Sequence, residues 1–139
     1  MIDPLEVAIT YLRQTPDLQR LTHDRISAKH QYGVTWQVGD AAIVVSLDGG
    51  TPDLDLPRQV IQLDVRCYAA STQVALSLWL ALAALTRESY RVRVPTANGT
   101  ALVYRFQPKS GPSTLYDKEI GSDVVLALFV LDVAEAAVA

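Results

Sequence analysis

The chain has 139 residues, of which half are hydrophobic and 19% are charged, and its net charge is -3. This composition excludes a disordered chain, and the small net charge gives no general attraction to nucleic acid or to a membrane surface. The single cysteine, Cys67, excludes an internal disulfide and a cysteine-based zinc site. We expect one globular domain over residues 1–139, with Cys67 as a buried, inert thiol.

Two features bear on the location of the protein. Asp3 and Glu6 do not fit the basic and then apolar layout of a signal peptide. The longest apolar run, Val74–Leu85, is shorter than the roughly 20 residues that cross a membrane. We expect a protein that is intracellular when it is made and does not enter membranes.

The first helix is predicted from Asp3-Pro4, where Asp3 caps the helix and Pro4 occupies its first turn. An apolar face follows at helical spacing, made by Leu5, Ala8, Ile9 and Leu12. Thr15-Pro16 ends this run, and residues 17–21 are compatible with a further short turn.

The stretch that organises the chain is Gln59–Arg87. It begins as an alternating strand, with Ile61, Leu63, Val65 and Cys67 on one face. Ser71 is placed to cap a helix, and from Val74 to Leu85 only Ser77 is polar. A helix that is apolar all round must be covered on more than one flank, so we expect a neighbouring subunit to cover part of it.

Further strands are predicted on both sides of this stretch. A β-hairpin is expected from the alternating runs Tyr90–Val94 and Thr100–Phe106, with a turn at Pro95–Gly99. Asp123–Val133 is apolar on both parities, which is typical of a strand that is buried on two faces. The remaining expectations are a strand at Ala41–Leu47, a mobile acidic loop at Asp48–Pro57, a break at Pro108–Pro112, a short strand at Ser113–Tyr116, and an edge strand or loop at Asp24–Ser27. The pattern predicts an α+β fold, with a mostly antiparallel sheet of five or six strands and two helices on one face.

No catalytic motif is visible. His23-Asp24 resembles half of a metal-binding dyad, but His30 is the only other histidine. Gly49-Gly50 is followed by Thr-Pro, which denies it the helix N-terminus that an anion site uses. The acidic residues of this loop, Asp48, Asp53 and Asp55, lack the spacing of a calcium loop. We expect no enzyme activity, no metal and no cofactor.

Basic residues are concentrated around the predicted hairpin: Arg91, Arg93, Arg105 and Lys109. Arg91 and Arg93 share a parity, and Arg105 is expected to join them across the strand pair. One interpretation is a solvated sheet face. The other is a docking surface, for DNA phosphates or for an acidic partner. The acidic segments 48–64 and 117–123 have the complementary sign, so a head-to-tail ring of subunits is one way to pair them.

A surplus of apolar residues also favours assembly of subunits. Trp79, Leu76 and Leu80 on the helix and the two-sided strand Val124–Val133 present more apolar faces than one small core uses. Trp79 is also compatible with an ordinary core position. We expect part of this surface to close a subunit interface.

The order of these parts resembles the tail completion, or tail terminator, proteins of long-tailed bacteriophages. The similarity lies in the opening helix Ile2–Arg13 and in the junction Gln62–Ala75, where a Gln-x-Asp-Val strand leads through Tyr-Ala-x-Ser into an Ala/Leu-rich helix. Ser110-Gly-Pro, an acidic turn and a long apolar strand complete it.

This resemblance implies a small α+β subunit of a ring, usually hexameric, that caps the finished tail tube, stops its polymerisation and offers the surface for head joining. The implied partners are further copies of the chain, the tail tube protein and a head–tail connector, with DNA passing through the lumen without specific binding. The implied location is the virion tail or neck, after assembly in the host cytoplasm. By analogy, the acidic loop 48–57 and the hairpin tip 95–99 are expected at the ends or the lumen of the ring. The alternatives are another neck or head-closure ring protein and, in a different class, a small ligand-binding module or an enzyme whose site forms only at a subunit interface.

Overall fold

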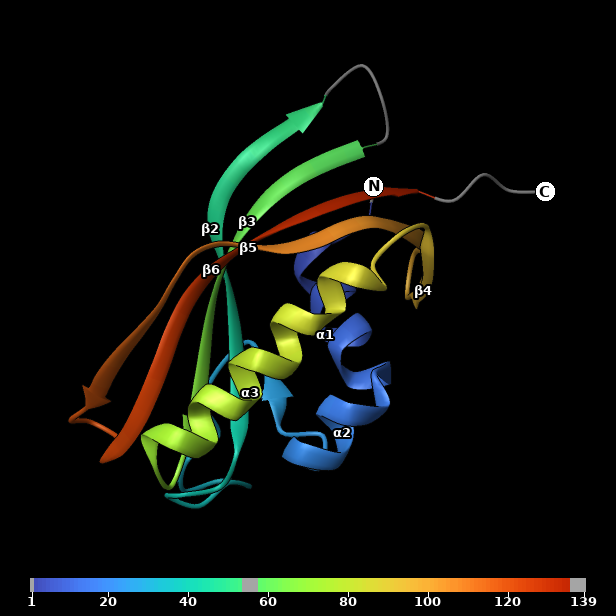
Figure 1. Ribbon diagram of the computed structural model, residues 1–139. Helices are drawn as coiled ribbons and strands as arrows, with labels where there is room; N and C mark the ends of the chain where they lie inside the picture. The colour runs from blue at the N-terminus through green and yellow to red at the C-terminus, as the bar shows by residue number, and fades with distance from the viewer. Residues whose placement is uncertain (1, 54–57, 136–139) are drawn as a thin grey trace.

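The computed structural model describes residues 2–53 and 58–135, with side chains omitted for 51–53, and it has three helices on one side of a curled sheet (Figure 1). The described helices are α1 (Pro4–Gln14), α2 (Pro16–Thr22) and α3 (Thr72–Ala84), which continues into a 3₁₀ turn at Leu85–Arg87. The described strands are β1 (Ile26–Ser27), β2 (Ala42–Asp53), β3 (Arg58–Ala69), β4 (Val92–Thr96), β5 (Gly99–Asp117) and β6 (Ser122–Glu135). Their order in the sheet is β1-β2-β3-β6-β5-β4.

The sheet is antiparallel except at one edge, where the two-residue strand β1 pairs in parallel with β2. The longest ladders join β6 to β3 and to β5, so the C-terminal strand lies in the middle of the sheet. This arrangement confirms the predicted α+β class and mostly antiparallel sheet. Two helices were predicted, and the structure has a further one, because Pro16 begins a separate helix, α2, rather than a single turn.

The helix caps form as their residues predict. The Asp3 carboxylate accepts the backbone N–H of Leu5, and the Ser71 hydroxyl accepts that of Val74. Pro16 follows Thr15 directly, which ends α1 and starts α2.

The core lies between the helices and one face of the sheet. The predicted inward parity of β3 is confirmed, because Ile61, Leu63, Val65 and Cys67 are all buried in it. β6 contributes Val125, Ala127, Phe129, Leu131 and Val133, and Phe106 of β5 stacks on Phe129 with ring centroids 4.8 Å apart. Side chains alternate between the two faces of a strand, so the even-numbered residues of β6 lie on the face without helices.

Two predicted loops are strands instead. β2 continues through Asp48 to Asp53, so residues 48–53 of the acidic loop expected at 48–57 are strand, and residues 54–57 lie outside the described residues. The register shift between Leu47 and Gly50 explains this, because a bulge lets a strand pass through turn-forming residues. Likewise, the break expected at Pro108–Pro112 lies within the continuous strand β5, where two register shifts accommodate the prolines.

Candidate interaction surfaces

One face of the sheet carries no helix, and a loop covers only part of it. Trp36, from the segment between β1 and β2, is buried against Tyr68 of β3 and Val124 of β6. The His30 ring lies 4.9 Å from the Trp36 ring and 4.6 Å from the Tyr68 ring, both edge-on. Tyr68 in turn donates to the Asp117 carboxylate at 3.3 Å. This aromatic cluster therefore fastens the loop over one end of the helix-free face.

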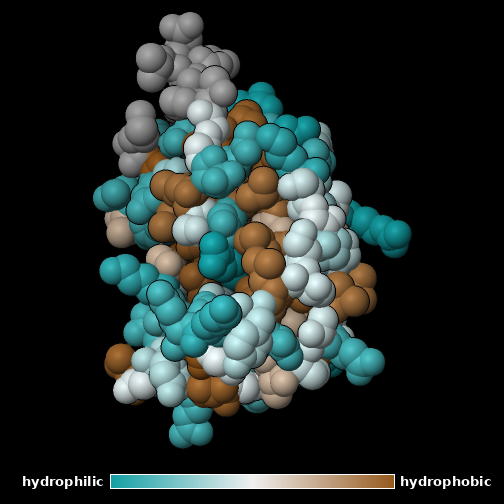
Figure 2. Space-filling model, turned by 90° about the vertical axis from the view of Figure 1, so that its left-hand side faces the viewer, coloured by the Kyte–Doolittle hydropathy of each residue, from teal (hydrophilic) through white to brown (hydrophobic). Residues whose placement is uncertain are grey.

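Beyond the aromatic cluster, the helix-free face has an uncharged apolar strip. Leu126, Leu128 and Val130 of β6 lie on it and are half-buried. Gln62, Asp64 and Arg66 of β3 flank them on one side, and Gln107, Ser110 and Ser113 of β5 flank them on the other. We call Leu126, Leu128 and Val130 the β6 strip. Figure 2 looks onto this side of the molecule, where apolar side chains gather near the middle with hydrophilic ones around them.

Two hollows lie at or near the β6 strip. One hollow of about 270 Å³ is lined by Asp48, Ser110 and Ser113 with Leu126 and Leu128. The other, of about 360 Å³, lies toward the tip of the β5–β6 hairpin. It is lined by Arg66, Leu115, Tyr116, Asp117, Lys118, Glu119 and Val124. Leu126 and Leu128 of the strip therefore line the smaller hollow, whereas the larger hollow lies beyond the strip, toward the hairpin tip.

A second apolar surface lies on α3. The helix buries Ala75, Leu78 and Leu82 against the core, but Leu76 and Leu80 on its opposite side are 36% and 56% exposed. Ala84 is also exposed, and these three residues stand four positions apart, in one stripe along the helix. We call Leu76, Leu80 and Ala84 the α3 stripe. The expectation that this helix is apolar on its solvent side is confirmed.

Trp79 is not part of the exposed stripe. It is half-buried and packs against the core, which agrees with the ordinary core position considered for it. Its indole N–H is buried and has no hydrogen-bond partner among the described residues.

The basic residues do not form the predicted cluster. β4 begins at Val92, and Arg91 precedes it with a left-handed backbone (φ 55°), so strand alternation does not relate Arg91 to Arg93. Arg93 pairs across the hairpin with Leu102, whereas Arg105 lies opposite Asp132 of β6. Arg93 and Arg105 share the helix-free face by register, but they are not directly opposite each other. All three are exposed.

Lys109 is exposed on the part of β5 that β4 does not reach, since β4 pairs only with Gly99–Val103. A lysine, together with Pro108 and Pro112, is a typical protection of an open strand edge against unwanted pairing. The predicted hairpin turn is also shorter than expected, and the Ala97 N–H donates to the Glu6 carboxylate at 2.8 Å. The hairpin tip is thus held against α1 rather than extended as a flexible segment.

Of the acidic candidates, the structure describes the side chain of Asp48. Asp48 lines the smaller hollow and is exposed. The backbone of Asp53 pairs with Arg58, and Asp55 lies outside the described residues. The ranges 2–53 and 58–135 contain no group of three or more His, Cys, Asp or Glu side chains that is arranged to hold a metal ion.

Sequence reasoning missed an ion pair whose carboxylate is buried. Asp132 is 4% exposed on the otherwise apolar strand β6, and it accepts two hydrogen bonds from the Arg58 guanidinium, at 2.8 Å and 2.5 Å. The Arg58 guanidinium also lies 5.5 Å from the centre of the Tyr104 ring. The sequence signal for this pair was the charged residue Asp132 inside an apolar run, because such a residue is buried only when it is paired.

The chain matches no protein-family model, and a comparison with curated protein sequences finds no match. Among the helices in the described part of the chain, none is both long enough and apolar enough to cross a membrane.

Proposed function

We propose that this protein is a structural subunit without enzyme activity that assembles with further copies of itself into a ring. The observation that carries the proposal is the presence of two uncharged apolar surfaces, the α3 stripe and the β6 strip, on different sides of one subunit. Surfaces of this kind mark protein–protein interfaces. A contact between the α3 stripe of one copy and the β6 strip of the next is head-to-tail, and repeated head-to-tail contacts close a ring when the rotation fits.

We further propose that the ring is a tail terminator, which caps a phage tail tube, ends its polymerisation and provides the head-joining surface. The support is the resemblance of the α1 and β3–α3 sequences to that family, together with the α+β subunit that the resemblance implies. The partners would be the tail tube protein and a head–tail connector, and the ring would belong to the virion tail or neck. Another neck ring protein is the second possibility within the same class.

Electron microscopy of the purified protein, alone and mixed with tail tubes, tests this function. We expect rings on the ends of tubes and shorter tubes when the protein is added during polymerisation. Leu80→Arg is the matched loss-of-assembly variant, because Leu80 is exposed and its replacement leaves the core intact. Val34→Arg, at a 78% exposed loop position, is the control. Tubes that grow to the same length with or without the wild-type protein would contradict the terminator function.

A ligand-binding module is the alternative from a different class. Its place would be the hollow of about 360 Å³ beside Tyr116, where Arg66 and Lys118 provide positive charge and Asp117 and Glu119 provide negative charge. A protein that stays monomeric, and whose stability rises with an added small molecule, would favour this alternative.

A further inference from the structure

We infer that the α3 stripe of one copy lies along the β6 strip of the next copy, with the C-terminal end of α3 at the tip of the β5–β6 hairpin. This inference rests on the proposed ring and assigns the two surfaces that meet in it. The occupant of the β6 strip is thus a second copy of this chain.

The two surfaces match in length and character. From Leu76 to Ala84 the stripe is about 12 Å long at the helical rise, and from Leu126 to Val130 the strip is about 13 Å long at the strand rise. No charged residue occurs between Ser71 and Thr86, and the strip has none on its floor. A contact between the α3 stripe and the β6 strip buries the two apolar surfaces without leaving a charge unpaired.

Charge selects the direction in which the helix lies. After α3 the chain carries Arg87, Glu88, Arg91 and Arg93, a net charge of +2 from three basic residues and one acidic residue. The hairpin tip carries Asp117, Lys118, Glu119 and Asp123, a net charge of -2 from three acidic residues and one basic residue. At neutral pH the favourable arrangement places the basic end of the helix at the acidic tip.

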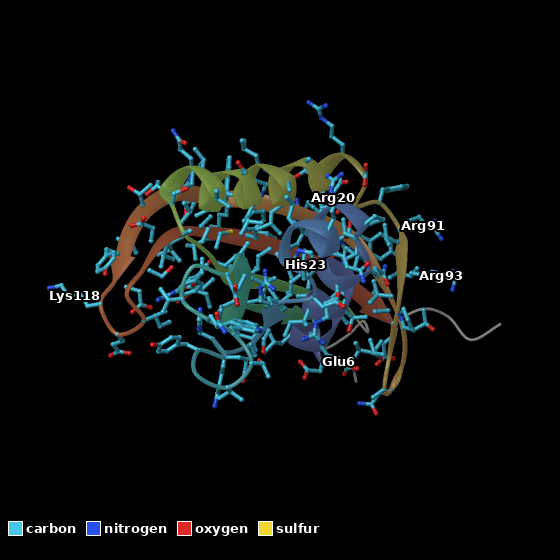
Figure 3. The ribbon with its side chains drawn as sticks, turned by 90° about the horizontal axis from the view of Figure 1, so that it is seen from below. Glu6, Arg20, His23, Arg91, Arg93 and Lys118 are labelled. Carbon is cyan, nitrogen blue, oxygen red and sulfur yellow. The ribbon has the colours of Figure 1, made fainter. Side chains whose placement is uncertain are left out.

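These opposite charges cannot meet within one subunit. Figure 3 shows Lys118, at the hairpin tip, at one end of the molecule, and Arg91 and Arg93 at the opposite end. A contact between two copies can bring them together, and the head-to-tail contact of the apolar surfaces proposed above does so.

Cysteine cross-linking between single variants tests the contact. Leu80→Cys and Leu128→Cys, the central residues of the two surfaces, are purified separately, mixed and oxidised. The native Cys67 does not interfere, because it is fully buried and burial raises its thiol pKa to about 12. We expect a disulfide-linked dimer only in the mixture, and not when Leu80→Cys is mixed with Val34→Cys. Thermal melts and sedimentation of each variant check that it still folds and assembles.

The outcomes separate this inference from the proposed function. An oligomer of wild-type mass without the Leu80–Leu128 disulfide would overturn the contact and leave the ring standing. Efficient cross-linking of Leu80→Cys with itself would overturn the head-to-tail arrangement. A chain that stays monomeric at every concentration would overturn both.

A charge exchange tests the direction of the helix. Arg87→Glu and Glu119→Arg are each expected to weaken association by about 2- to 5-fold, as exposed pairs do, and the double variant is expected to recover part of the loss. Both residues are exposed, so the fold should be unaffected. Losses that simply add in the double variant would contradict the assigned direction.

Discussion

At the scale of single residues, the buried pair Arg58–Asp132 links the two central strands β3 and β6. Asp132 is almost fully buried, whereas the Arg58 side chain is 48% exposed, so the arginine reaches in from the surface to neutralise the carboxylate. The geometry is bidentate, which is the strong form of this interaction.

We predict that Asp132→Ala lowers the free energy of unfolding by about 1–3 kcal/mol. The loss is below that of a fully buried pair because the freed Arg58 guanidinium can turn toward water. Denaturant unfolding measures it. Asp17→Ala is the control, because the Asp17–Arg20 pair is exposed on both sides and is expected to contribute no more than about 0.5 kcal/mol. Equal effects of the two variants would show that the buried pair does not stabilise the sheet.

His30 makes the loop over the helix-free face sensitive to pH. Burial among Trp36, Tyr32 and Tyr68 lowers the pKa of His30 below its usual 6.5, and the nearby Asp117 and Asp40 only partly offset this effect. The unfolded chain therefore binds a proton at a higher pH than the folded one. Stability that depends on neutral His30 is present above the unfolded pKa of about 6.5 and is lost as the pH falls through it toward the folded pKa.

We predict that acidification from about pH 7.5 to about pH 5 destabilises the wild type more than it destabilises His30→Phe, which keeps the ring contacts but does not titrate. Thermal melts at the two pH values give the comparison. An identical drop in Tm for both proteins would contradict this role of His30.

At the scale of elements, the sequence was informative wherever apolar periodicity decided the structure. The inward parity of β3 could be predicted because burial dictates it, and the cap at Ser71 because a serine hydroxyl can accept a first-turn N–H. The expected burial of β6 on two faces is not met within one subunit, since Leu126, Leu128 and Val130 are only half-buried. The path of β2 through Asp48 to Asp53 and of β5 through Pro108–Pro112 could not be predicted. Turn-forming residues mark a loop or a bulge equally well, and the choice depends on partner strands far away in the sequence.

The candidate interaction surfaces could likewise be predicted only in part. The exposed side of α3 was predictable from a helix without charges. The separation of Arg93 from Arg105 was not, because it depends on the register of β4 against β5 and on where β4 begins. The aromatic cluster of His30 was not predicted either, since it joins a loop to two strands that lie far from it in the sequence.

The bulge of β2 gives a prediction at this scale. Gly50 has φ 141°, and a Cβ there would lie 2.4 Å from the Val60 carbonyl oxygen and 2.7 Å from the Ile61 Cα, both of them backbone atoms. We expect Gly50→Ala to cost about 2–4 kcal/mol in the free energy of unfolding, from the strained φ and the clash together. Gly49→Ala is the matched control, because φ is also positive there but no atom lies within 4 Å of the added Cβ. It should cost about 1 kcal/mol. If the two variants were equally stable, β3 would not constrain the bulge.

At the scale of the whole molecule, the helices and the sheet pack together around one core, and apolar surface is still left on two sides. The covered part of the helix-free face shows that the chain closes such surface where it has a segment to do so, as Trp36 does over Tyr68 and Val124. The β6 strip and the α3 stripe have no such cover within the described residues. Further copies of the subunit are the simplest cover for both.

Sedimentation velocity of the wild-type protein over a range of concentrations, compared with Leu80→Arg, tests this central claim most directly. We predict that the wild type forms a closed species whose mass is a fixed multiple of 15.2 kDa, and that Leu80→Arg stays monomeric with an unchanged Tm. A wild-type chain that remains monomeric up to about 1 mM, where an association free energy of only about -4 kcal/mol would be detected, would contradict it.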